Sequence, residues 1–117
     1  MRDLAIQAAG GFAIIIAVIH GVLGETKVFA KARIEPAWAR LLIRLVWQGG
    51  AAAWVAFGIL LIAVPYMGSE PARLWIACAA AAVYVLHAIG NAWAMRGRHV
   101  GWMALTVVSA LALAGAW

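Results

Sequence analysis

Four long apolar stretches make up most of this sequence. They run over residues 4–24, 41–64, 74–94 and 100–117. A helix needs about 20 apolar residues, within a range of about 17–25, to cross the hydrocarbon core of a bilayer. Each stretch meets that requirement, and little chain is left for a separate soluble domain. We therefore expect a single domain over residues 1–117, an all-α integral membrane protein that folds as an antiparallel up-down four-helix transmembrane bundle.

The composition excludes the main alternatives to a membrane protein. Hydrophobic residues make up 68% of the chain and charged residues 11%, whereas soluble domains have roughly 45–50% and about 25%. A soluble fold of 117 residues could not bury so much apolar surface, because small domains leave much of their surface in water. Disorder requires low hydrophobicity. An intrachain disulfide is also excluded, since Cys78 is the only cysteine.

The distribution of positive charge predicts the orientation of the bundle. The segment between the first two stretches, with its flanks, carries Lys27, Lys31, Arg33, Arg40 and Arg44, and the last connection carries Arg96 and Arg98. Only Arg2 and Arg73 lie on the other side. Cytoplasmic loops are enriched in Lys and Arg. We therefore expect a bacterial-type inner membrane or plasma membrane, with both termini outside (periplasmic) and the two basic loops in the cytoplasm. The net charge of +5 is thus assigned to orientation, and we expect no nucleic-acid partner.

Polar residues inside the apolar stretches are the best candidates for function. His20, Gln48, His87 and Thr106 lie seven to nine residues from the nearest basic flank of their stretch. At 1.5 Å per residue this places all four about 10–13 Å below the basic surface. Polar groups are costly in a bilayer, so each needs a partner or a role. Tyr84 and Asn91 share a helical face with His87. The candidates for a ligand site or a proton relay are His20, Gln48, Tyr84, His87, Asn91 and Thr106.

Two interpretations of this polar layer stay open. The residues could hydrogen-bond between helices and stabilise the bundle, each contributing roughly 0.5–2 kcal/mol. They could instead line a ligand or proton site, because imidazole titrates near neutral pH. The second interpretation predicts a small transport or ligand-binding membrane protein with His20, Gln48 and His87 in its cytoplasmic half. The first suits an accessory or scaffold subunit of a larger membrane complex. In either case the partners would be the lipid bilayer and either further copies of the chain or other subunits.

Cofactor and enzyme signals are few. His20 and His87 would suit a bis-histidine haem b in an electron-transfer subunit, because both lie in parallel helices at similar depth. No other metal site is expected. The sequence has no phosphate-binding loop, His-Glu-x-x-His or Gly-x-Ser-x-Gly motif, so we do not expect an enzyme. At the basic edge of the membrane, Glu25 and Arg44 either form an ion pair or Arg44 extends to lipid phosphates.

Overall fold

A computed structural model describes residues 1–117 as an entirely helical chain. The elements in order are α1 (Arg2–Leu23), the π-helical turn η1 (Gly24–Phe29), α2 (Ala37–Ala63), the 3-10 turn η2 (Val64–Tyr66), α3 (Glu70–Ala94) and α4 (Gly101–Ala114). The helices follow the predicted apolar stretches, with starts up to four residues earlier in α1, α2 and α3. The side chain of Ser69 begins α3 by accepting a hydrogen bond from the N–H of Ala72, which satisfies one of the free donors of a helix start.

Three of the four helices are long and apolar enough to cross a membrane. They are α1 with η1, α2 with η2, and α3. The predicted span over residues 100–117 is shorter than expected, because α4 has only 14 residues. Its length is about 21 Å at 1.5 Å per residue, less than the roughly 30 Å of a hydrocarbon core. Gly101 and Gly115 bound this helix.

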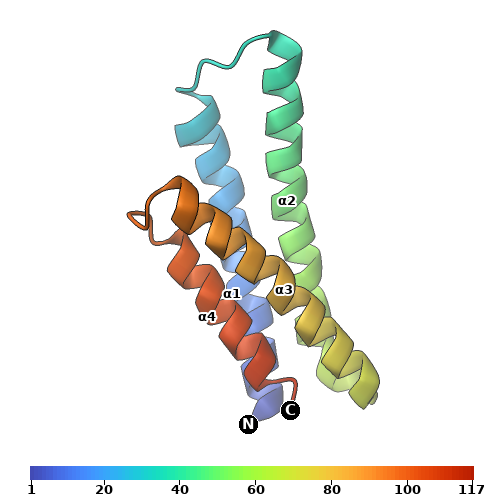
Figure 1. The fold of residues 1–117 in the computed structure, drawn as a ribbon. Helices are drawn as coiled ribbons and strands as arrows, with labels where there is room; N and C mark the ends of the chain where they lie inside the picture. The colour runs from blue at the N-terminus through green and yellow to red at the C-terminus, as the bar shows by residue number, and fades with distance from the viewer.

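The central helix of the fold is α1, which packs along α2 on one side and along α4 on the other. α3 begins beside the end of α2, separates from α2 as it crosses the bundle at an angle, and packs along α4 (Figure 1). Both termini lie side by side at one end of the molecule (Figure 1). At the other end the α1–α2 hairpin extends beyond the turn that joins α3 to α4 (Figure 1). The two basic loops therefore lie at different heights along the long axis of the molecule. Four helices of equal length would have placed them at the same height.

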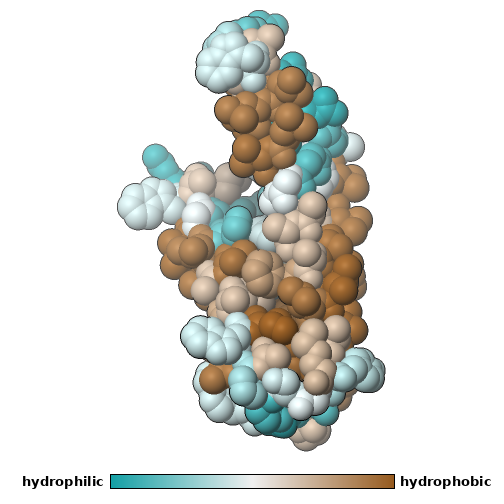
Figure 2. All heavy atoms as spheres, turned by 90° about the vertical axis from the view of Figure 1, so that its right-hand side faces the viewer, coloured by the Kyte–Doolittle hydropathy of each residue, from teal (hydrophilic) through white to brown (hydrophobic).

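Small residues allow the helices to approach closely. A Cβ atom on Gly10 would collide with the carbonyl oxygen of Gly58, and one on Gly58 would lie 2.8 Å from the Gly10 oxygen. Alanines of α1 and α3 fill much of the core, together with a few large side chains such as Ile6 and Leu61. Only 24 of the 117 residues are buried. Most of the apolar surface is thus on the outside, and Figure 2 shows hydrophobic side chains over much of the middle of one face, with hydrophilic ones gathered at its lower end.

Charged side chains close the end of the bundle that holds the termini. Arg73 is only 5% exposed, and its guanidinium donates to the carbonyl oxygen of Gly115 at 3.0 Å and to the carboxylate of Asp3. Arg2 pairs with Glu70 beside it. Because these four charges cancel, the whole net charge of +5 belongs to the helix ends and loops away from the termini.

Candidate functional site

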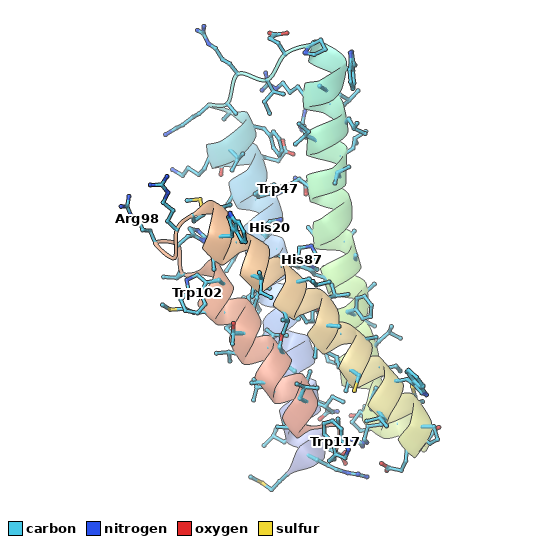
Figure 3. The ribbon with its side chains drawn as sticks, viewed as in Figure 1. His20, Trp47, His87, Arg98, Trp102 and Trp117 are labelled. Atoms are coloured by element: carbon cyan, nitrogen blue, oxygen red, sulfur yellow. The ribbon has the colours of Figure 1, made fainter.

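Two tryptophans of α2 organise the centre of the candidate site. Trp47 and Trp54 are seven residues apart and therefore lie on nearly the same face of the helix. The imidazole of His20, from α1, stacks on the Trp47 ring with 4.1 Å between centroids and 6° between planes. The same imidazole lies 4.7 Å from the Trp54 ring. His87, from α3, meets the Trp54 ring edge-on at 5.0 Å. The structure thus brings His20 and His87 to the Trp54 indole. Figure 3 labels His20, His87 and Trp47 in the same part of the molecule.

A cavity of about 620 Å³ opens beside these rings. All three histidines of the chain line it, because His99 of the α3–α4 turn joins His20 and His87 there. Along α1 the lining extends from Phe12 to Val28, which is about 24 Å of helix. The cavity is therefore an elongated space between α1, the end of α3 and the start of α4. Most of its lining is apolar, which is typical of small-molecule sites.

Two buried polar atoms have no hydrogen-bond partner in the chain. They are Nε1 of Trp54 and Oδ1 of Asn91, and both residues line the cavity. Trp54 is only 3% exposed. Leaving a buried donor or acceptor unpaired costs about 1–3 kcal/mol. Both atoms are covered by the protein, so a molecule in the cavity would reach them only after neighbouring side chains move.

Hydrogen bonds fix the ring nitrogens of two histidines. Nδ1 of His87 lies 2.8 Å from the carbonyl oxygen of Val83. A carbonyl only accepts, so Nδ1 carries the proton and Nε2 of the neutral ring is free to accept a proton or bind a metal. Nδ1 of His99 accepts from the N–H of Gly101 at 3.0 Å and thereby caps the start of α4. In the neutral form, His99 then carries its proton on Nε2.

Gln48 does not belong to this cavity, contrary to the predicted polar layer. Its amide donates to the carbonyl oxygen of Gly21 at 3.1 Å and to Oε1 of Glu25 at 2.8 Å. Gln48 directly follows Trp47 in α2. Its side chain is therefore rotated by about 100° about the helix axis, away from the face that carries the two tryptophans. Gln48 forms a second polar cluster with Glu25 and Arg44. These two residues form an ion pair, in which Nη2 of Arg44 lies 2.7 Å from Oε2 of Glu25. Of the two alternatives that the sequence leaves open for Arg44, the structure has the ion pair with Glu25.

Tyr84 and Thr106 also lie outside the cavity. Tyr84 is fully buried, and its hydroxyl donates to the carbonyl oxygen of Trp54 at 2.9 Å. Thr106 is exposed, and its hydroxyl donates to the carbonyl oxygen of Trp102 one turn earlier at 2.8 Å. Ser and Thr hydroxyls within a helix commonly donate to the backbone carbonyl four residues earlier. Of the six candidate site residues, the cavity therefore collects His20, His87 and Asn91.

Three cavity residues were missed by reading the sequence. Trp47 and Trp54 are not among the predicted site residues, although their spacing of seven residues places them on one helical face. His99 is not among them either, because a histidine that directly follows Arg98 is expected to be exposed to solvent. Its position two residues before Gly101 was the available signal, since a side chain there can accept the first free N–H of the next helix.

No three His, Cys, Asp or Glu side chains come together where they could hold a metal ion. Comparison of the chain with protein-family models, with curated proteins and with solved structures finds no match in any of the three. The role of the cavity is therefore inferred from its shape, its lining and its unpaired polar atoms.

Proposed function

We propose that this chain is a small multi-pass membrane protein that binds a small amphipathic ligand in the cavity of His20, His87 and Asn91, for transport or for presentation within the membrane. The observation that carries the proposal is the Trp54 indole. It is buried and in contact with both histidines, and its N–H has no partner. A group that only packed the bundle would have its donor satisfied, as the hydroxyl of Tyr84 is.

Membrane insertion is the first part of this proposal. Three helices of suitable length and an apolar outer surface support it. We place both termini on the outer side and the basic loops in the cytoplasm. The charge pattern supports this orientation, because the termini end carries only Arg2 and Arg73, whereas the remaining helix ends and loops carry seven Lys and Arg residues, and Lys and Arg are enriched on the cytoplasmic side.

A haem b group held by His20 and His87 is a second candidate. The hydrogen bond from Nδ1 of His87 to Val83 favours it, because metal-binding histidines commonly donate their other N–H to a backbone carbonyl. The absorption spectrum of the purified protein tests this candidate. A Soret band that disappears in both His20→Ala and His87→Ala would support it, and a spectrum without such a band would rule it out.

A subunit or scaffold role is the third candidate. The start of α2 carries Trp38, Leu41 and Leu42 with large exposed fractions, beyond the level at which Arg44 pairs with Glu25. Such a surface suits other helices or further copies of the chain. Purification in a mild detergent, followed by mass determination of the intact particle, distinguishes a homo-oligomer from a complex with other chains.

The ligand-binding proposal is tested by asking what purifies with the protein. Native mass spectrometry of the chain in a mild detergent should reveal a bound small molecule, and His20→Ala and His87→Ala should reduce its occupancy. Thr106→Ala is the matched control, because Thr106 is a polar residue outside the cavity. Equal occupancy in all three variants, or no bound molecule in the parent protein, would contradict the proposal.

A further inference from the structure

Every ionisable side chain that lines the cavity of His20 and His87 is basic. The lining contains Lys27 and all three histidines of the chain, and it contains no Asp, Glu, Cys or Tyr. Lys27 brings a positive charge, and an imidazole also becomes positive when it takes up a proton. No carboxylate of the lining offsets these groups. The charge of the cavity therefore favours an anionic ligand.

Lys27 and His99 lie toward the same end of the cavity. His20 and His87 are at one level, because both contact the Trp54 indole. Seven residues further along α1, about 10 Å, the chain reaches Lys27. The same number of residues along α3 completes that helix, and His99 follows in the next turn. This end of the cavity is therefore the one nearest the basic loops.

The polar side chains at this end can donate hydrogen bonds. His99 accepts the N–H of Gly101 at Nδ1, so its neutral ring carries the proton on Nε2 and donates from there. The ammonium of Lys27 only donates. The amide nitrogen of Asn91 lies close by, because a Cβ atom on Gly101 would be 2.8 Å from Nδ1 of His99 and 3.3 Å from this nitrogen. A carboxylate only accepts and is therefore the complement of this set.

The rest of the cavity is apolar and open to the side. Its lining continues through Leu23, Ile19, Ile16, Ile15 and Phe12 of α1, with Ala104 and Leu105 of α4. Ile15 and Ile19 are also more than half exposed on the outer surface. An acyl chain in this groove contacts the protein on one side and the surrounding lipid tails on the other. A lipid already in the leaflet can thus enter sideways without moving its charge into the hydrocarbon core.

The size of the cavity suits a lipid with one chain. Its volume of about 620 Å³ lies within the roughly 300–1,000 Å³ of pockets that hold one small molecule. Lys27 is the only Lys, Arg, Asp or Glu of the lining. A single-chain lipid with one negative charge matches both features, whereas a phospholipid brings a second chain and a larger headgroup.

From these features we infer that the ligand of this cavity is a long-chain fatty acid. Its carboxylate lies between Lys27 and His99 at the edge of the membrane, and its acyl chain follows α1 past Ile19 toward Phe12. The covered indole N–H of Trp54 is not part of the contact. This assignment rests on the proposed ligand-binding function and names the class of its ligand.

A photoreactive palmitic acid, with a diazirine near the end of its acyl chain, tests this site. The purified protein would be reconstituted in phosphatidylcholine nanodiscs, and the labelled peptide would be identified by mass spectrometry. We expect labelling of α1 between Phe12 and Ile19. Unlabelled palmitate should compete about tenfold better than methyl palmitate, because the ester has the same chain but cannot form a hydrogen bond as a charged acceptor. Equal competition by the two would overturn the assigned carboxylate contact.

Substitution of Lys27 tests the position of the carboxylate. Lys27→Gln should raise the Kd of palmitate by about tenfold, because a charge-assisted hydrogen bond is lost. Lys27→Arg keeps the charge and should retain most of the binding. Lys31→Gln is the matched control, since Lys31 is an exposed lysine four residues further on and outside the cavity, and its Kd should equal that of the parent protein. Equal Kd values for Lys27→Gln and Lys31→Gln would overturn the assigned site.

A second pair of variants tests the path of the acyl chain. Ala104→Leu places a larger side chain in the lining and should reduce photolabelling severalfold. Ala110→Leu is the control, because Ala110 is exposed and outside the cavity, and circular dichroism and thermal melting would verify that both variants fold. Labelling that is unchanged in Ala104→Leu would overturn the assigned path.

Two outcomes separate the fatty acid from the proposed function. Failure of palmitate to bind, while native mass spectrometry finds another bound small molecule, would overturn the fatty acid assignment alone. Failure of palmitate to bind, with no bound molecule of any kind, would overturn the proposed function as well.

Discussion

The hydroxyl of Tyr84 donates a hydrogen bond to the backbone carbonyl of Trp54, 2.9 Å away, and so ties α3 to α2 one helical turn from His87. Apart from this contact the two helices diverge over much of their length. This bond therefore helps to hold His87 against the Trp54 ring, together with the packing of α3 along α4.

Tyr84→Phe should destabilise the protein by about 1 kcal/mol, because one buried hydrogen bond is lost while the ring still packs. Reversible unfolding in mixed detergent measures this loss. Tyr66→Phe is the matched control: the Tyr66 hydroxyl accepts a bond from Gln7 at the surface, and its removal should change stability by less than about 0.5 kcal/mol. Equal effects of the two substitutions would show that the Tyr84 bond does not hold α3 in place.

Arg73→Met should lower the free energy of unfolding by about 1–3 kcal/mol. The substitution leaves the carbonyl of Gly115 and the carboxylate of Asp3 without their buried donor, which has a cost of that order. The exposed pair of Arg2 and Glu70 provides a comparison, since solvent screens it. Unfolding curves of Arg73→Met and Arg2→Met should therefore differ, and a larger loss for Arg2→Met would contradict the proposed importance of the buried arginine.

Neighbouring glycines in α1 should respond in opposite directions. Gly10→Ala places a methyl group against the carbonyl of Gly58, and such overpacking typically costs about 1–3 kcal/mol. Gly11→Ala meets nothing within 4 Å and should stabilise the helix by up to about 1 kcal/mol. The melting temperatures of the two variants check this pair. A stable Gly10→Ala protein would mean that α1 and α2 pack less closely than described.

The proposed orientation predicts opposite accessibility for the two ends of the bundle. Single cysteines would be introduced at Trp117, which is largely exposed beside the N-terminus, and at Ala32, in a chain that carries Cys78→Ala. A membrane-impermeant thiol reagent added to intact cells should label position 117 and leave position 32 unlabelled. The reverse pattern would invert the orientation, and labelling of both positions would argue against a single insertion.

Much of the fold could be predicted from hydropathy alone, because the apolar runs locate the helices α1, α2 and α3 to within four residues. The length of α4 could not, since Val100 and the last residues of the chain are apolar whether or not they are helical. The different levels of the two basic loops depend on the tilt of α3. The packing of small residues determines this tilt, and the hydrophobic periodicity of the sequence does not predict it.

The candidate site was predicted only in part. His20 and His87, expected at a similar depth, and Asn91, expected on the helical face of His87, all line one cavity. Gln48 does not, because a helical face differs by about 100° between adjacent residues and depth alone carries no rotational information. Tyr84 shares a face with His87, yet its hydroxyl reaches a carbonyl of α2 first. The hydrogen-bond partner of a polar side chain depends on how the helices pack against one another. A single sequence does not predict that packing.

The guanidinium of Arg73 donates hydrogen bonds both to Asp3, in the first turn of α1, and to Gly115, the residue after α4. The two extremities of the polypeptide are thus close enough for a short peptide linker to join them, and new ends opened within residues 30–36 would give a circular permutant. In that rearranged chain both free ends would emerge on the opposite face of the bilayer, while the helix contacts around Trp54 stayed as they are.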